Sequence, residues 1–99
     1  MQQPITKQQI EELQQQNNPI KLIDIRTPAE YEKSHVPDAL NIPAEIIAEN
    51  ISKFAANDTI VCICHKGQER SQNAAETIAG LGLANVFYLK DGTVGWLAE

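Results

Sequence analysis

The sequence has little of what marks exported, membrane-bound or nucleic-acid-binding proteins. No apolar run approaches the roughly 20 residues that a membrane-spanning helix needs, and residues 1–4 lack the basic and apolar stretches of a secretory signal. The chain contains 8 lysines and arginines against 13 aspartates and glutamates, which gives a net charge of −5. Nonspecific nucleic-acid binding depends on clustered basic residues that meet phosphates. We therefore expect no membrane and no nucleic-acid partner, and a cytoplasmic location.

Cysteine is also scarce. The 99 residues include only Cys62 and Cys64, which are too close in a regular strand for a useful disulfide. Together with His65 and the distant His35, they do not reproduce the ligand spacing of a zinc site. We predict no metal and no cofactor, and a reducing compartment in which at least one thiol reacts. The pattern favours Cys62 as a small buried strand residue.

The order of predicted elements indicates the fold class. The length suits one domain with one core, and no internal repeat or linker divides residues 1–99. Short β-branched runs typical of buried strands alternate with predicted helices, two of which begin with helix-capping signals. The predicted strands cover 20–25, 40–42, 59–63 and 86–89, and the predicted helices cover 7–16, a segment from 28 onward, 44–50, 71–81 and 93–98. Such alternation predicts right-handed crossovers and a parallel sheet sandwiched by helices, with ligands beyond the carboxyl ends of the strands.

The segment 64–70 lies at such a carboxyl end, between the predicted strand 59–63 and the predicted helix 71–81. A loop folded there can point backbone N–H groups inward and add to the positive end of the helix dipole, which attracts anions. A thiolate is itself an anion, so the same field favours the reactive form of Cys64. We therefore predict that Cys64 is a catalytic nucleophile.

Other residues of this loop suit the binding of an anionic substrate. Gly67 permits a backbone conformation closed to most residues. Lys66 and Arg70 add positive charge, and the planar guanidinium of Arg70 can make a forked contact to a tetrahedral oxyanion. The predicted substrate-binding residues are His65, Lys66, Gly67, Gln68, Glu69 and Arg70.

Motifs along nearly the whole chain resemble, in order and spacing, those of a known family. They comprise 22–26, 30–31, 35–43, Cys64 and Gly67 with Arg70 and Ser71, 82–83, 86, 89–92 and Trp96. In these stretches the chain is similar to the single-domain rhodaneses. The resemblance implies an α/β fold with three α/β/α layers around a central, mainly parallel sheet, formed by a single rhodanese-like domain over residues 1–99.

The same resemblance implies a sulfur-transfer reaction. The Cys64 thiolate would attack the outer sulfur of thiosulfate or a similar donor and expel sulfite. The resulting Cys64 persulfide would pass its sulfur to cyanide, a thiol or a protein acceptor, which is covalent catalysis of the ping-pong type. The implied partners are thus a small sulfur-donor anion and a thiophilic acceptor, and the enzyme class is a thiosulfate sulfurtransferase.

Departures from the family pattern keep two alternatives open. Five residues, 65–69, separate Cys64 from Arg70, one more than in most rhodaneses of this kind. Such a Cys-x5-Arg loop resembles that of rhodanese-fold phosphatases and arsenate reductases, although Ile63 stands where the phosphatases usually have histidine. The third reading is a non-catalytic binding module, since a fold does not fix a function.

Several residues outside the loop are predicted to have structural roles. Asp24 and Arg26 are expected to form an ion pair that positions loops. His35 is expected to make a hydrogen bond at the turn that follows it, and Trp96 to fill the core under the active-site side. Three residues stand where the family often has glycine, with expected effects on turns rather than on chemistry: Ser34, Asp38 and Asp91.

Overall fold

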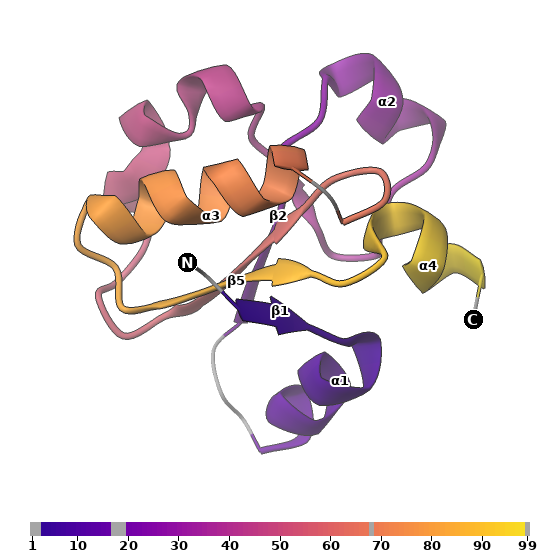
Figure 1. Ribbon diagram of the computed structural model, residues 1–99, viewed down its shortest axis with the longest axis horizontal. Helices are drawn as coiled ribbons and strands as arrows, with labels where there is room; N and C mark the ends of the chain where they lie inside the picture. The colour runs from indigo at the N-terminus through magenta and orange to yellow at the C-terminus, as the bar shows by residue number, and fades with distance from the viewer. Residues whose placement is uncertain (1–2, 17–19, 68, 99) are drawn as a thin grey trace.

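A computed structural model describes residues 3–16, 20–67 and 69–98 of the chain. Five strands form one sheet in the order β1-β5-β4-β2-β3, and every pairing is parallel (Figure 1). The strands are β1 (Gln3–Ile5), β2 (Ile20–Asp24), β3 (Leu40–Asn41), β4 (Thr59–Ile63) and β5 (Asn85–Leu89). The central strand β4 pairs with β2 on one side and with β5 on the other.

Helices lie on both faces of this sheet. The α-helices are α1 (Lys7–Gln15), α2 (Pro28–Lys33), α3 (Glu69–Gly80) and α4 (Gly92–Ala98), and two 3₁₀ helices, η1 (Ala44–Ile46) and η2 (Ala48–Lys53), precede β4. Figure 1 shows α3 on one side of the strands and α1 on the other. The architecture is therefore the three-layer α/β/α fold that the resemblance implied.

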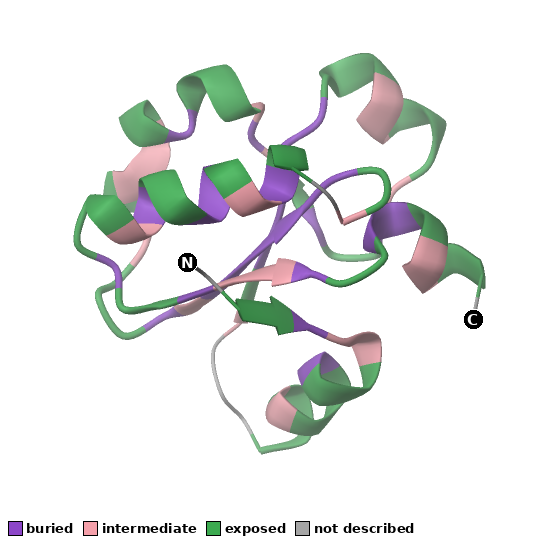
Figure 2. Cartoon of the chain, in the orientation of Figure 1, coloured by how far each residue is buried: buried purple, intermediate pink, exposed green. Residues whose placement is uncertain are grey.

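The core consists of two clusters, one on each face of the sheet. Successive strand residues point to opposite faces, and along β4 Ile60 and Cys62 belong to the first cluster while Val61 and Ile63 belong to the second. The first cluster packs under α3 and the 3₁₀ helices, and the second under α1. Figure 2 shows the central strands buried and the buried positions of α3 interrupted by exposed ones.

The capping signals predicted for two helices are confirmed. Thr6 and Gln9 form a capping box at the start of α1, with Gln9 N donating to Thr6 Oγ1 at 3.1 Å and Thr6 N donating to Gln9 Oε1 at 2.9 Å. Thr27 and Glu30 form an equivalent box at the start of α2, where Pro28 occupies the first helical position. The first turn of each helix is thus fixed by its own sequence.

The structure adds two local details that the sequence did not indicate. The segment predicted as helical over 44–50 is a pair of 3₁₀ helices rather than an α-helix, because neither of the two has a side-chain cap and β-branched isoleucines lower α-helix propensity there. Strand β1 was not predicted. It has three residues and pairs only with β5, so its formation depends on the open edge of the folded sheet.

Two of the residues that replace glycine adopt the backbone conformation that glycine favours. Asp38 has φ of 70° and Asp91 has φ of 65°, both in the left-handed region. Aspartate enters this region more readily than most residues, so both turns keep the left-handed geometry. Over the described residues, no helix is long and apolar enough to cross the hydrocarbon core of a membrane.

Candidate active site

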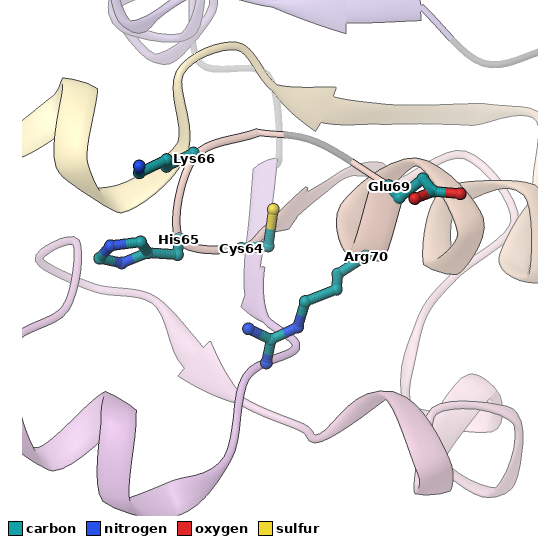
Figure 3. A pocket seen from close by; sticks show the side chains of 5 residues that line it. All are labelled: Cys64, His65, Lys66, Glu69 and Arg70. Atoms are coloured by element: carbon teal, nitrogen blue, oxygen red, sulfur yellow. The ribbon is translucent and has the colours of Figure 1, made fainter.

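Cys64 directly follows β4 at the carboxyl end of the sheet, where the sequence placed it. Its side chain is only 2% exposed. A cavity of about 270 Å³ opens beside it, lined by Cys64, His65, Lys66, Glu69 and Arg70 (Figure 3). The structure thus brings five of the seven predicted site residues to one cavity. Gly67 belongs to the same loop, and Gln68 lies outside the described residues.

The loop backbone curves around the Cys64 sulfur, while the charged side chains extend outward. In Figure 3 His65 and Lys66 point to one side of the sulfur and Glu69 to the other. All three side chains are exposed to solvent. The polar side chains of the loop therefore lie at the rim of the cavity, while the cysteine itself is buried.

The β5–α4 turn supports this loop through main-chain contacts. Thr93 N donates to Cys64 O at 2.9 Å, and Val94 N donates to His65 O at 3.0 Å. These bonds use two of the amides that the first turn of α4 leaves without helical partners. The loop that carries the cysteine is thus tied to the last helix of the chain.

Glycines permit the close approach of loop and turn. Gly67 has φ of +70° and Gly92 has φ of +58°, so both are left-handed. A Cβ built on Gly92 would lie 2.5 Å from Cys64 O and 2.6 Å from Gly67 N, and one built on Gly67 would lie 2.5 Å from Leu89 O. Side chains at either position would separate the two backbones. The predicted role of Gly67 in the loop conformation is consistent with this geometry.

A buried hydroxyl contacts the cysteine. Ser71 Oγ lies 3.2 Å from Cys64 Sγ, within hydrogen-bond distance, and Ser71 is fully buried in the first turns of α3. Ser71 was not among the predicted site residues. The sequence does contain a signal for its burial. Ser71 stands at helical spacing before the buried residues of α3, which are Ala74, Ala75 and Ile78, so it lies on the same face of the helix.

Arg70 is engaged by a carboxylate from another element. Its Nη2 donates to Glu30 Oε1 at 3.0 Å and its Nη1 to Glu30 Oε2 at 3.4 Å. The hydrogen bond from Arg70, with a further one from the Thr27 backbone, lowers the pKa of Glu30 to about 2, and Glu30 in turn raises the pKa of Arg70. In the view of Figure 3 the Arg70 guanidinium and the Cys64 sulfur point in opposite directions. The forked contact predicted for an oxyanion is made here to Glu30.

Cys62 is a buried strand residue, as predicted. Its side chain is fully buried, and desolvation, together with the nearby Cys64, raises its thiol pKa to about 12. The two cysteines do not form a disulfide. Within the described ranges, no group of three or more histidine, cysteine, aspartate or glutamate side chains is arranged to hold a metal ion.

The predicted Asp24–Arg26 ion pair is confirmed. Arg26 Nη2 lies 2.7 Å from Asp24 Oδ2, and Arg26 Nε donates to both carboxylate oxygens at 2.9 and 3.1 Å. Both side chains are buried. Arg26 Nη2 also donates to Ser34 O at 2.6 Å, and Asn41 Nδ2 donates to the carbonyls of Asp24 and Arg26. The pair therefore connects β2 with the end of α2, and the main chain of the same two residues is bonded to β3.

The predictions for His35 and Trp96 hold only in part. His35 Nδ1 lies 2.8 Å from Tyr31 O, and its ring stacks on Tyr31 at 3.8 Å between centroids. The hydrogen bond is thus structural, but it joins the preceding helix α2 rather than the following turn. Trp96 packs against the core as predicted, but on the face of the sheet opposite the cluster that contains Cys64, rather than under the active-site side. Lys7 Nζ lies 5.1 Å from the centroid of its ring.

Comparisons with known proteins agree with the fold and the motifs. The family model described as Rhodanese-like domain matches residues 6–99. The putative sulfur carrier protein YrkF of Bacillus subtilis is 32% identical over 80 residues, which cover 81% of this chain and 43% of that protein. The chain thus matches less than half the length of this relative.

A second relative matches over more of its own length. The thiosulfate sulfurtransferase GlpE of Pseudomonas syringae is 31% identical over 75 residues, covering 76% of this chain and 70% of that protein. Among solved structures, the human single-domain sulfurtransferase TSTD1 superposes with a TM-score of 0.86 at 20% identity, over 97% of this chain and 96% of that one, which supports the fold alone. The chain belongs to the rhodanese-like family, and a protein named thiosulfate sulfurtransferase is among its relatives.

Proposed function

We propose that the protein is a sulfurtransferase that carries sulfane sulfur as a persulfide on Cys64. The observation that carries this proposal is the position of Cys64 at the carboxyl end of β4, beside a cavity whose rim includes Lys66 and Arg70. A relative named for thiosulfate sulfur transfer supports thiosulfate or a similar anion as the donor. Residues 1–99 would act as one domain, and the acceptor would be a thiol, cyanide or a protein thiol.

The proposed reaction balances without a cofactor. The Cys64 thiolate attacks the outer sulfur of thiosulfate, the S–S bond of the donor breaks, and sulfite leaves with the electron pair. The acceptor then attacks the terminal sulfur of the Cys64 persulfide, and the Cys64 thiolate leaves. Sulfite needs no proton to leave, so His65 would contribute its backbone amide rather than acid–base catalysis.

The loop supplies groups that can stabilise the charges in this reaction. The Ser71 hydroxyl, 3.2 Å from Cys64 Sγ, can donate to the thiolate. Lys66 at the cavity rim can attract the sulfonate end of the donor. The amides of residues 65–69 would act on the thiolate and the persulfide in the manner of an oxyanion hole. This role is the reason to include Gly67 and Gln68 among the proposed binding residues.

The spacing between Cys64 and Arg70 makes a rhodanese-fold phosphatase or arsenate reductase the second candidate. The ion pair between Arg70 and Glu30 argues against it, because those reactions need a guanidinium that binds the oxyanion directly.

An intact-mass measurement after incubation with thiosulfate tests the proposal. We expect an added mass of one sulfur atom in the wild type and in Cys62→Ala, and no addition in Cys64→Ser. Absence of the adduct in the wild type, or its persistence in Cys64→Ser, would contradict sulfur transfer. Turnover of an aryl phosphate or arsenate that disappears in Cys64→Ser would favour the second candidate, and absence of every activity would favour a binding module.

A further inference from the structure

The positive charge at the Cys64 cavity is largely balanced by carboxylates. The cavity lining includes the cations Lys66 and Arg70 and the anion Glu69. Glu30 bonds to the Arg70 guanidinium from α2, with 3.0 Å between Nη2 and Oε1. Arg70 would be the cation that binds the second negative charge of a dianionic donor, and its guanidinium therefore already has a carboxylate partner.

Glu30 is held in place independently of Arg70. Its Oε1 accepts from Thr27 N and from Thr27 Oγ1, both at 3.1 Å, and Glu30 N donates to Thr27 Oγ1 at 3.3 Å. This capping box fixes the carboxylate at the start of α2. Arg70 therefore pairs with a preorganised acceptor, which costs less side-chain entropy than pairing with a freely rotating one.

A donor that uses Arg70 has to compete with this carboxylate. A dianion gains more from an available cation than a monoanion does, because Coulomb energy scales with the product of the charges. Occupation of Arg70 by Glu30 therefore lowers the binding of a dianion more than that of a monoanion. Both partners are partly exposed, 48% for Arg70 and 36% for Glu30, so solvent screening makes the effect moderate.

We propose that Glu30 sets the donor specificity of the Cys64 site, by occupying Arg70 so that doubly charged thiosulfate is accepted less well relative to singly charged sulfane donors. The inference rests on the proposed sulfur transfer and names its substrate class: organic thiosulfonates and persulfides. With a thiosulfonate, the Cys64 thiolate attacks the terminal sulfur, the S–S bond breaks, and a sulfinate leaves with the electron pair. The product is again the Cys64 persulfide anion.

The test compares kcat/KM for thiosulfate and for methanethiosulfonate in the wild type and in Glu30→Gln. Glutamine keeps the capping box, as Gln9 does at the start of α1, so α2 retains its start while Arg70 loses its anionic partner. Because the ion pair is partly exposed, its effect is small, and we expect the thiosulfate-to-thiosulfonate ratio to rise about threefold to fivefold.

Two further variants assign the effect to Arg70. Glu32→Gln removes one negative charge from the same helix, and Glu32 takes part in no ion pair with any residue that the structure describes. We expect this control to leave the ratio within about a factor of two, since its charge is exposed and screened. The double variant Glu30→Gln/Arg70→Gln should return the ratio to the wild-type value. An unchanged ratio in Glu30→Gln, or an increase that survives in the double variant, overturns the proposal.

An equilibrium measurement separates this inference from the proposed function. Cys64→Ser cannot form the persulfide, so thiosulfate binding to it reports on the charges alone. We expect the Kd for thiosulfate in Cys64→Ser/Glu30→Gln to be about threefold lower than in Cys64→Ser, by NMR titration. Equal Kd values with a normal wild-type adduct refute the role of Glu30 only. If the Kd is lower in Cys64→Ser/Glu30→Gln but the wild type gains no sulfur from thiosulfate, the proposed sulfur transfer is refuted and the role of Glu30 in anion binding is not.

Discussion

The Cys64 sulfur has a buried hydroxyl beside it, that of Ser71 at 3.2 Å. A hydrogen bond to a charged group contributes about 1.5 to 3 kcal/mol. We expect Ser71→Ala to slow formation of the Cys64 persulfide about tenfold or more, measured by quenched-flow mass spectrometry with thiosulfate. The unfolding free energy should change much less, because alanine fits the same volume. Ser52→Ala, an exposed change in η2, is the control, and equal rates in both variants would remove Ser71 from the site.

Glu30 provides a pH-dependent prediction. Its pKa is lowered to about 2, first by the hydrogen bond from Arg70 and next by the Thr27 backbone. A carboxyl whose pKa is lower in the folded than in the unfolded state stabilises the fold at pH values above its unfolded-state pKa. This stabilisation is lost as the pH falls toward the folded-state pKa. Since the pair is partly exposed, we expect a contribution below about 1 kcal/mol.

The Glu30 prediction is checked by carboxyl NMR titration. In Arg70→Gln the midpoint for Glu30 should rise, yet remain below its ordinary value, because the Thr27 amide still donates to it. A midpoint that does not move in this variant would mean that the ion pair seen in the structure does not persist in solution. The same result would remove the basis for a role of Glu30 in donor selection.

The sequence predicted the residues of the site that are consecutive and missed those that depend on tertiary contacts. Cys64 and its loop follow from a strand end, a glycine and two cations within seven residues. Glu30 stands 40 residues from Arg70, and its pairing requires α2 to lie beside the loop. The polar character of Ser71 is visible in the sequence, but its contact with Cys64 depends on the rotation of α3.

Among the elements, the turn between β5 and α4 determines the shape of the loop. Gly92 is left-handed, and a Cβ there would lie 2.5 Å from Cys64 O. We expect Gly92→Ala to reduce the unfolding free energy by about 2 kcal/mol or more, since strain and displacement add, and to abolish persulfide formation. Urea unfolding and the mass assay measure the two effects.

A matched pair of glycines in helix α3 and its following turn serves as control. Gly80 has open space around its Cβ position, and Gly82 has open space but φ of +109°. We expect Gly80→Ala to be neutral or stabilising by up to about 1 kcal/mol, and Gly82→Ala to cost only backbone strain. Both should keep full persulfide formation. Loss of persulfide formation in Gly80→Ala or Gly82→Ala would contradict the importance of the main-chain contact. So would an unchanged unfolding free energy and unchanged persulfide formation in Gly92→Ala.

Elements with clear local signals were predictable, whereas β1 and the 3₁₀ type of the segment 44–53 were not. β4 was predicted at its observed limits, because five consecutive β-branched and apolar residues indicate a buried strand. The segment 44–53 has apolar residues at helical spacing but no caps, and it forms 3₁₀ turns instead. β1 consists of three residues, of which only Ile5 is buried, so the sequence contains too little pattern to identify it.

Over the whole molecule, the alternation of strands and helices was sufficient to predict the layers but not the strand order. The order β1-β5-β4-β2-β3 places β4 at the centre, with core clusters on both its faces and Cys64 at its end. The loop that carries Cys64 therefore extends from the most buried strand of the sheet. Its position depends on how firmly the neighbouring strand β2 and its connections are held.

The buried Asp24–Arg26 pair fixes those connections, and it provides a prediction for the whole molecule. Removing one member leaves an uncompensated buried charge, so we expect Arg26→Met to lower the unfolding free energy by about 3 kcal/mol or more. In Asp24→Asn/Arg26→Met no charge remains, and the asparagine Oδ1 can still accept from the backbone N–H of residue 26, which Asp24 Oδ1 does at 3.0 Å. We expect this double variant to recover at least about 1 kcal/mol in urea denaturation. If the double variant loses as much unfolding free energy as Arg26→Met, or as much as the two single variants together, the two residues stabilise the fold through packing rather than through their charges.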